Sequence, residues 1–263
     1  MIRVGPRRIM NMAAGTPTEA AAFAPSDISG LYLWLDASDA TTITLSGSDV
    51  TAWSDKSTGG NSLVSDGNPP ALLTADQNGL NGIDFDGTER LIDTTPNSNL
   101  SGQNQLAIFA IANNTSSTTS RSLISIWNDS ESAACWSLGK RNVTEEVHWL
   151  ISLLGTDSNA RQAGNMGTAG VAHFIGGDYS RSSIVSQLDV YDNDTVGENA
   201  TADSPLHNSA AALCIGGVED NSTYGLANFI GTVYEIVVYN ALITGTDFTN
   251  LKSYLINKWG VSV

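Results

Sequence analysis

Acidic side chains are the most numerous groups in this sequence that could do chemistry, with 27 Asp and Glu against 12 Lys and Arg. A glycosidase needs two carboxyl groups placed on either side of one glycosidic bond. Glu145–Glu146 and Glu219–Asp220 are adjacent in the chain, and adjacent residues of a strand point to opposite faces. Glu235 stands alone in an apolar run, which favours a structural hydrogen-bond acceptor. Because no strand carries a catalytic carboxylate pair, we expect a protein that is not an enzyme.

The other residue types that commonly support catalysis are scattered along the chain. The three histidines, His148, His173 and His207, lack the spacing of a zinc site. The chain has no Gly-x-Ser-x-Gly turn for a nucleophilic serine and no Gly-Lys-Ser/Thr phosphate loop. We therefore assign no catalytic residue and no metal ligand.

Two loops rich in Asp and Asn are the candidate ligand-binding sites. Residues 189–197 (DVYDNDTVG) carry three aspartates whose oxygens suit calcium, but they lack the spacing of an EF-hand loop. Asp and Asn are also ordinary turn formers, so a plain turn is preferred and calcium is kept as the alternative cofactor. Residues 128–132 (NDSES) form a weaker candidate loop. The residues we assign to ligand binding are Asn128, Asp129, Asp192, Asn193 and Asp194.

Six tryptophans could act as platforms for sugar rings, because an aromatic face packs against a pyranose. Each of them lies in or beside an apolar run, so we expect all six in the core. They are Trp34, Trp53, Trp127, Trp136, Trp149 and Trp259.

Composition excludes several classes of protein. Hydrophobic residues make up 41% of the chain and charged residues 15%, which suits a folded sheet protein with polar turns. The formal net charge of −15 repels phosphate backbones, so nucleic-acid binding is not expected. No run approaches the length of a membrane span, and no membrane insertion is expected. Cys135 and Cys214 lie in apolar stretches and are predicted to be buried thiols, with a disulfide as the open alternative.

Residues 1–26 differ in composition from the rest of the chain. A basic tip with Arg3, Arg7 and Arg8 precedes an Ala/Thr/Pro stretch without periodicity, which indicates an extended arm. Its apolar residues are too interrupted for a signal peptide, so we expect synthesis in the cytoplasm without export by the general pathway. The three arginines are predicted to bind a partner.

From Gly30 onward, about a dozen short apolar runs separated by turn residues predict an antiparallel sandwich or jelly roll. Residues 105–112 are apolar on both faces, which indicates a central strand covered on both sides. Asp86–Gly87 between two such runs predicts a tight hairpin.

One segment departs from the strand pattern. Phe248, Leu251, Leu255 and Trp259 recur at helical spacing and form one apolar stripe. Thr246 is the expected N-cap, and Gly260 stands where a helix C-terminus prefers glycine. The chain is predicted to end in one amphipathic helix docked on the sandwich.

Three stretches together resemble laminin-G-like, concanavalin A-like jelly-roll domains of the type found in phage structural proteins. They are GLYLWLDASDATTITLSGSDVTAWSDKSTGGNS (30–62), NGIDFDGTERL (81–91) and FIGTVYEIVVYNALITGTDFTNLKSYLINKWGV (229–261). The resemblance implies a sandwich of two curved antiparallel sheets over residues 27–263. It also implies binding of glycans or proteins, sometimes through a calcium ion at the rim, although fold alone does not fix function.

A binding sandwich without an export signal suggests a virion protein. We expect a non-enzymatic phage structural or decoration protein that is anchored through its arm to other virion proteins or to copies of itself. Its sandwich would then attach to host-surface glycans. The alternatives are a bacterial lectin-like module exported by a non-classical route and, less favoured, a polysaccharide-active enzyme.

Overall fold

The computed structural model describes residues 23–95, 99–116, 120–128, 130–141, 146–156, 159–164, 166, 170–181, 186–201, 203–220 and 226–263. Arg3, Arg7 and Arg8 of the predicted arm lie outside these residues, as does Asp129 of the weaker candidate loop.

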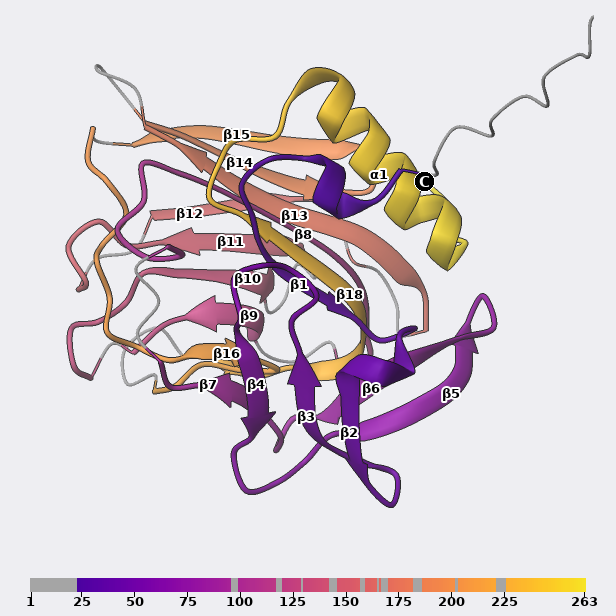
Figure 1. The fold of residues 1–263 in the computed structure, drawn as a ribbon. Coiled ribbons are helices and arrows are strands. Elements are labelled where there is room, and N and C mark those ends of the chain that lie inside the picture. The colour runs from indigo at the N-terminus through magenta and orange to yellow at the C-terminus, as the bar shows by residue number, and fades with distance from the viewer. Residues whose placement is uncertain are drawn as a thin grey trace, which may run out of the picture.

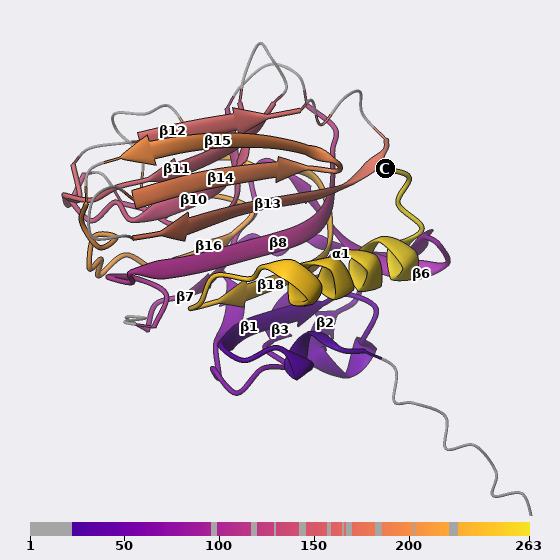
Figure 2. The same cartoon turned by 90° about the horizontal axis from the view of Figure 1, so that it is seen from above.

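The strands form two layers that face each other (Figures 1 and 2). The first layer has the order β15 (Thr195–Thr201), β14 (Ser186–Asp192), β13 (Ala172–Ser180), β8 (Gln105–Asn114) and β18 (Ile230–Tyr239), with β1 (Leu31–Asp36) and β6 (Leu80–Asp86) sharing the far side of β18. The second layer has the order β12 (Asn159–Ala163), β11 (Val147–Ile151), β10 (Trp136–Lys140), β9 (Arg121–Ile126), β16 (Leu213–Ile215), β7 (Leu91–Asp93) and β4 (Ser62–Ser65).

Short strands close one side of the sandwich. β3 (Asp49–Ser54) pairs with β2 (Ile43–Ser46), β4 and β5 (Ala71–Gln77), and β5 continues into β6, so the two layers are joined by hydrogen bonds. Among the described strands, β17 (Ala227–Asn228) pairs in parallel with β9, and an isolated parallel bridge joins Asn128 to Asp220. The predicted all-β, two-sheet antiparallel sandwich with one C-terminal helix is confirmed.

The core lies between the layers and is rich in large apolar side chains. β8 is buried on both faces over most of its length, as its sequence predicts. Trp53, Trp127, Trp136, Trp149 and Trp259 are fully buried, whereas Trp34 is half-buried. Gly177 of β13 faces Trp149 across the core, and a Cβ at this position would come within 2.5 Å of the indole ring. Cys135 and Cys214 are both buried and free, as predicted.

Helix α1 (Gly245–Trp259) covers the outer face of the first layer along β8 and β18 (Figure 2). Its apolar stripe is confirmed, because Leu251, Leu255 and Trp259 are buried and Phe248 packs against Phe109 of β8 at 5.5 Å between ring centroids. Among the described residues, no helix has the length and hydropathy needed to span a membrane.

The sequence predicts a capping residue at each end of α1, and the structure confirms one of the two. Gly260 ends the helix in the left-handed conformation with φ 63°, as expected. The N-cap is Thr244 and not Thr246, which lies within the first turn. Thr244 is the last residue with extended backbone angles, so the helix begins two residues earlier than the capping pattern predicts.

The hairpin predicted at Asp86–Gly87 is wrong. Asp86 does form a turn, because its Oδ1 accepts hydrogen bonds from the amide and hydroxyl of Thr88. The strands on either side separate, however: β6 pairs with β5 and β18, while β7 pairs with β4 and β16. The turn therefore carries the chain from one layer to the other.

Candidate functional site

Glu235 is the centre of a buried polar network beneath α1. Its carboxylate is fully buried in β18 and accepts hydrogen bonds from the indole N–H groups of Trp34, at 2.7 Å, and Trp259, at 2.6 Å. The Lys258 ammonium lies 2.7 Å away, and the Tyr254 hydroxyl donates at 3.2 Å. The pKa of this carboxyl lies above its usual value because of burial, and the Lys258 ammonium offsets only part of that rise. The predicted role of Glu235 as a structural acceptor is confirmed.

Asp36, at the end of β1, joins two lysines from distant parts of the chain. Its carboxylate lies 2.8 Å from both the Lys56 and the Lys258 ammonium groups. Lys56 also pairs with Asp39 at 2.9 Å and lies 4.4 Å from the centre of the Trp34 ring. Burial alone would raise the pKa of Asp36, but the two lysines outweigh it and hold the pKa below its usual value.

Asp55 fixes the loop that presents Lys56. Its carboxylate accepts hydrogen bonds from the backbone N–H of Trp34 at 2.9 Å and of Ser57 at 2.7 Å. The side-chain amide of Asn61 donates both to Asp55 and to the carbonyl of Tyr32. The segment WSDKS (53–57) therefore works as a structural unit that holds the loop 55–61 against β1.

Two hollows open on the surface on either side of the short helix η1 (Pro25–Asp27). The first, here called the helix hollow, measures about 500 Å³ and is lined by Phe23, Asn250, Ser253, Tyr254, Asn257 and Lys258. Phe23 meets Tyr254 edge-on, with 6.0 Å between ring centroids. The side chains of Asn250, Ser253 and Asn257 are exposed and have no hydrogen-bond partner among the described residues.

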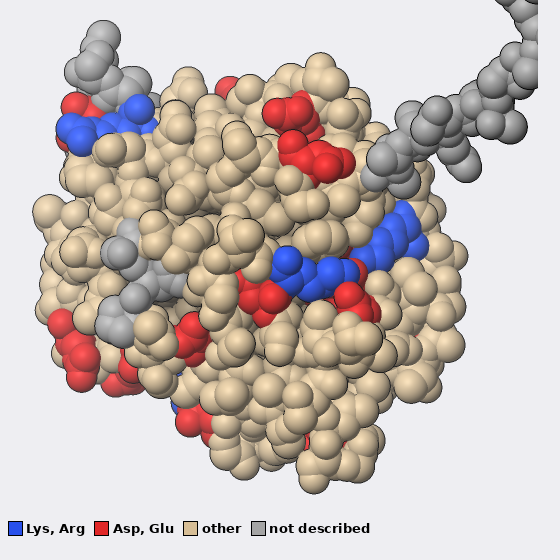
Figure 3. Space-filling view, in the orientation of Figure 1, with Lys and Arg blue, Asp and Glu red and all other residues tan. Residues whose placement is uncertain are grey.

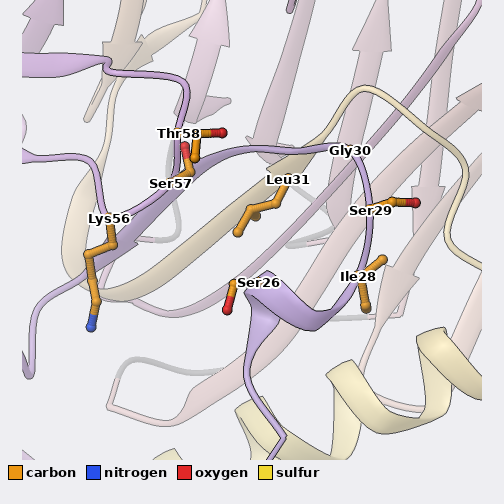
Figure 4. A pocket seen from close by; sticks show the side chains of 8 residues that line it. All are labelled: Ser26, Ile28, Ser29, Gly30, Leu31, Lys56, Ser57 and Thr58. Carbon is orange, nitrogen blue, oxygen red and sulfur yellow. The ribbon is translucent and has the colours of Figure 1, made fainter.

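The second hollow, here called the loop hollow, measures about 270 Å³ and is lined by Ser26, residues 28–31 and residues 56–58. In Figure 4, Ser26 and Leu31 lie between Lys56 on one side and Ile28 on the other. The two hollows are linked, because Lys56 lines one, Lys258 lines the other, and Asp36 binds both ammonium groups.

The charged groups around the hollows are all paired with one another. Lysine and arginine atoms form a band beside carboxylates near the middle of one face of the molecule (Figure 3). Two ammonium groups, those of Lys56 and Lys258, meet the three carboxylates of Asp36, Asp39 and Glu235. Hydrogen bonds from Thr41 and then the Lys56 contact lower the pKa of Asp39 to about 2, so it stays ionised. On this ion-paired base, the helix hollow presents neutral amides, hydroxyls and aromatic rings, and the loop hollow presents hydroxyls and apolar side chains.

The sequence-predicted loop residues lie elsewhere and are not brought together. Asn128 follows β9 in the second layer, and its Oδ1 accepts from the hydroxyl of Ser130 and the amide of Glu131. Asn193 and Asp194 form the two-residue turn between β14 and β15 in the first layer. Their role in ligand binding stays a prediction.

Each carboxylate of the β14–β15 turn has a partner within the protein. Asp192 lies 2.7 Å from Nδ1 of His173, and Asp194 lies 2.7 Å from the Lys252 ammonium, which also binds the carbonyl of Asn193. The Asn193 side chain accepts from the amide of Phe174. These contacts join the turn to both β13 and α1. The described residues contain no group of three or more His, Cys, Asp and Glu that could hold a metal ion.

We expect saturating calcium to leave the melting temperature unchanged. Asp192 and Asp194 point to different partners, so a calcium ion would have to displace His173 and Lys252 before it gained ligands. Thermal melts in excess calcium and in chelator test this, with Asp194→Ala as the companion variant. A calcium-dependent rise that Asp194→Ala abolishes would revive the calcium site, because a ligand of the native state stabilises by mass action.

A row of carboxylates crosses the outer face of the first layer, and sequence motifs did not reveal it. Asp178 of β13 stands opposite Asp189 of β14, which stands opposite Glu198 of β15. Directly opposed residues have Cβ atoms about 4.5–5.5 Å apart. Asp178 is only 2% exposed and accepts a hydrogen bond from the Tyr191 hydroxyl at 2.6 Å. Burial, with a smaller contribution from Asp189, raises the pKa of Asp178 to about 7.

The sequence matches no protein-family model and no curated protein. Its fold does match solved structures. One is the CBM40 domain of the Ruminococcus gnavus IT-sialidase bound to alpha2,3 sialyllactose, with a TM-score of 0.52 and 15% identity over 68% of this chain and 96% of that one. Domain 4 of AbnA, a GH43 extracellular arabinanase from Geobacillus stearothermophilus in complex with arabinotriose, matches with a TM-score of 0.50 and 14% identity over 84% and 98%.

A GH54 α-L-arabinofuranosidase matches with a TM-score of 0.57 and 12% identity over 88% of this chain. The present chain spans 60% of the length of that enzyme. At such identities the similarity establishes the fold alone. The shared fold is a β-sandwich, which the two sugar-bound domains above also have.

Proposed function

We propose that this chain is a non-enzymatic glycan-binding module whose site is formed by the helix hollow and the loop hollow. The observation that carries the proposal is the pair of unpaired amides of Asn250 and Asn257, with the hydroxyl of Ser253, beside the Phe23–Tyr254 rings in the helix hollow. Aromatic faces take the C–H surfaces of a sugar, while side-chain amides satisfy its hydroxyls. Support from the fold comes from two similar domains solved with bound sugars.

The network beneath the hollows gives such a site a rigid base. Tyr254 and Lys258 are held by Glu235, and Lys56 is held by Asp36 and Asp39. A ligand therefore meets side chains that are already ordered, which lowers the entropy cost of binding.

We further propose that the module belongs to a virion structural or decoration protein, anchored through residues 1–26 to other virion proteins or to copies of itself. This setting rests on the basic, Ala/Thr/Pro-rich composition of residues 1–26 and on the resemblance of three sequence stretches. The contacts of Phe23 with Tyr254, and of the Pro25 carbonyl with the Tyr239 hydroxyl, attach the end of the arm beside the helix hollow. Neighbouring genes for capsid or tail proteins would support the setting, and genes of a bacterial secretion system would favour the exported lectin.

The carboxylate row favours a second candidate, glycoside hydrolysis. Asp178 with a raised pKa opposite Asp189 is the kind of pair that retaining glycosidases use as acid and nucleophile. Against this, Asp178 is almost fully buried and held by Tyr191. Release of reducing ends from polysaccharides, lost in Asp189→Asn, would establish hydrolysis, and no release would leave binding.

A glycan array followed by isothermal titration tests the binding proposal. The double variant Asn250→Ala/Asn257→Ala should weaken binding of any glycan found on the array by about fivefold to a hundredfold, because two hydrogen bonds of about 0.5–1.5 kcal/mol each are lost. Both residues are exposed, so the fold should be unaffected. Thr249→Ala, also exposed on α1 but outside the hollow, is the matched control and should bind like the parent protein. Equal affinity for the double variant would move the site elsewhere.

A further inference from the structure

Lys56 is the group to which an acidic sugar in the loop hollow would bind. Among the described residues that line this hollow, Lys56 carries the one charged side chain, and 21% of that side chain is exposed. A lysine ammonium is a compact positive charge with three N–H donors, which suits the carboxylate or sulfate group of an acidic sugar. Whether Lys56 can receive such a group depends on the partners that it already has.

Two carboxylates already hold this ammonium group. Asp36 lies 2.8 Å from it and Asp39 lies 2.9 Å from it, and the centre of the Trp34 ring lies 4.4 Å away. Burial alone would lower the pKa of Lys56, but the hydrogen bonds to Asp36 and Asp39 outweigh it and raise the pKa above its usual value. Lys56 therefore stays charged, and its charge is matched within the protein.

The two carboxylates differ in their other contacts. Asp36 is buried and also pairs with the lysine of the helix hollow, so it belongs to the network that supports α1. Asp39 is half-buried and is the N-cap of the short helix η2 (Ala40–Thr42). Its Oδ1 accepts hydrogen bonds from the N–H and the hydroxyl of Thr41, while its Oδ2 faces the Lys56 ammonium. The capping contacts therefore orient a surface carboxylate toward Lys56.

The carboxylates beneath the two hollows leave no lysine charge unmatched. Asp36 and Asp39 match the charges of Lys56 and Lys258, and Glu235 adds a further carboxylate. An anion that enters either hollow therefore meets no unmatched positive charge on the described lining residues. Building on the glycan-binding function proposed above, we infer that Asp39 is a specificity-determining residue. By occupying Lys56, it makes the site discriminate against sugars that carry carboxylate or sulfate groups and select uncharged ones.

A glycan array that pairs each uncharged oligosaccharide with its monosulfated and uronic acid forms tests this inference. The parent protein should bind no acidic form more tightly than its uncharged counterpart. Asp39→Asn keeps a side chain that can cap η2 but removes the charge that faces Lys56. In this variant at least one acidic form should gain about fourfold in affinity relative to its uncharged counterpart, because removing a unit charge about 5 Å away in water has an effect of this size. Isothermal titration at low ionic strength measures the gain.

Two controls separate an effect of charge from an effect of structure. Asp49→Asn removes the same charge from an exposed residue that lines neither hollow, so it should leave the ratio of the two affinities unchanged. In about 1 M salt the gain of Asp39→Asn should largely disappear, because the Debye length is then only about 3 Å. A change in loop structure alone would instead alter the binding of uncharged glycans, and salt would not reverse it.

The outcomes separate the inference from the function on which it rests. Tighter binding of acidic forms by the parent protein, or an unchanged ratio of affinities in Asp39→Asn, would overturn the inference and leave glycan binding intact. If no array glycan of either kind binds, the proposed function fails together with the inference.

Discussion

Replacing Trp259 by alanine is expected to lower the free energy of unfolding by about 3–5 kcal/mol. Trp259 is fully buried, packs on Tyr234 with 5.3 Å between ring centroids, and donates its indole N–H to Glu235. The change would open a cavity under α1 and leave the Glu235 carboxylate with one donor fewer. For a domain of this size the melting temperature should fall by roughly 6–20 °C.

Two further variants make this result diagnostic. Trp259→Phe keeps an aromatic ring but removes the N–H group and part of the indole, so its free energy of unfolding should lie between those of the parent protein and Trp259→Ala. Ser253→Ala changes an exposed residue of the same helix and should shift the melting temperature little. A Trp259→Ala shift no larger than that of Ser253→Ala would mean that α1 is not docked on the sandwich.

The second large effect is a dependence of stability on pH that arises from Asp178. Its pKa is about 7 in the folded protein against an ordinary value of 3.8, so the folded state binds this proton more tightly than the unfolded state does. The stabilisation is therefore fully present below about pH 4 and is lost as the pH rises through about 7. Three pKa units correspond to about 4 kcal/mol as an upper limit.

The variant Asp178→Asn should remove this contribution. Urea unfolding of the parent protein and of the variant at several pH values between 4 and 8 measures the difference, in which the effects of the other titrating groups cancel. The stability of the parent should fall relative to the variant as the pH rises. Asp49→Asn, at an exposed carboxylate, is the control and should run parallel to the parent. Parallel curves for Asp178→Asn as well would place Asp178 in a far more hydrated environment.

The sequence predicted those features that depend on local patterns of polarity. The apolar stripe of α1, the two-sided burial of β8 and the burial of the core tryptophans all follow from which side chains must leave water. The Asp86–Gly87 turn shows the limit of this reasoning. Turn chemistry fixes the local bend, but whether the next strand pairs with the last depends on the layers that each strand completes.

The candidate site could not be predicted from local patterns of polarity, because its residues come from segments that are distant in the sequence. Phe23 and Tyr254 are brought together only when β1 pairs with β18 and α1 folds back over both. Part of the carboxylate row can be predicted from the sequence alone. A two-residue turn at Asn193–Asp194 pairs Asp192 with Thr195, and counting outward pairs Asp189 with Glu198. The addition of Asp178 requires the β13–β14 register, which the sequence does not supply.

Nuclear magnetic resonance titration with the glycan that binds most tightly on the array tests the central claim most directly. We expect the side-chain amide signals of Asn250 and Asn257, and the backbone signals of residues 23–31 and 56–58, to shift as the glycan is added. Signals from β10, β11 and the Asn193–Asp194 turn should stay in place. Shifts confined to that turn, or to the face with Asp189 and Glu198, would contradict the account and place the binding site outside the two hollows.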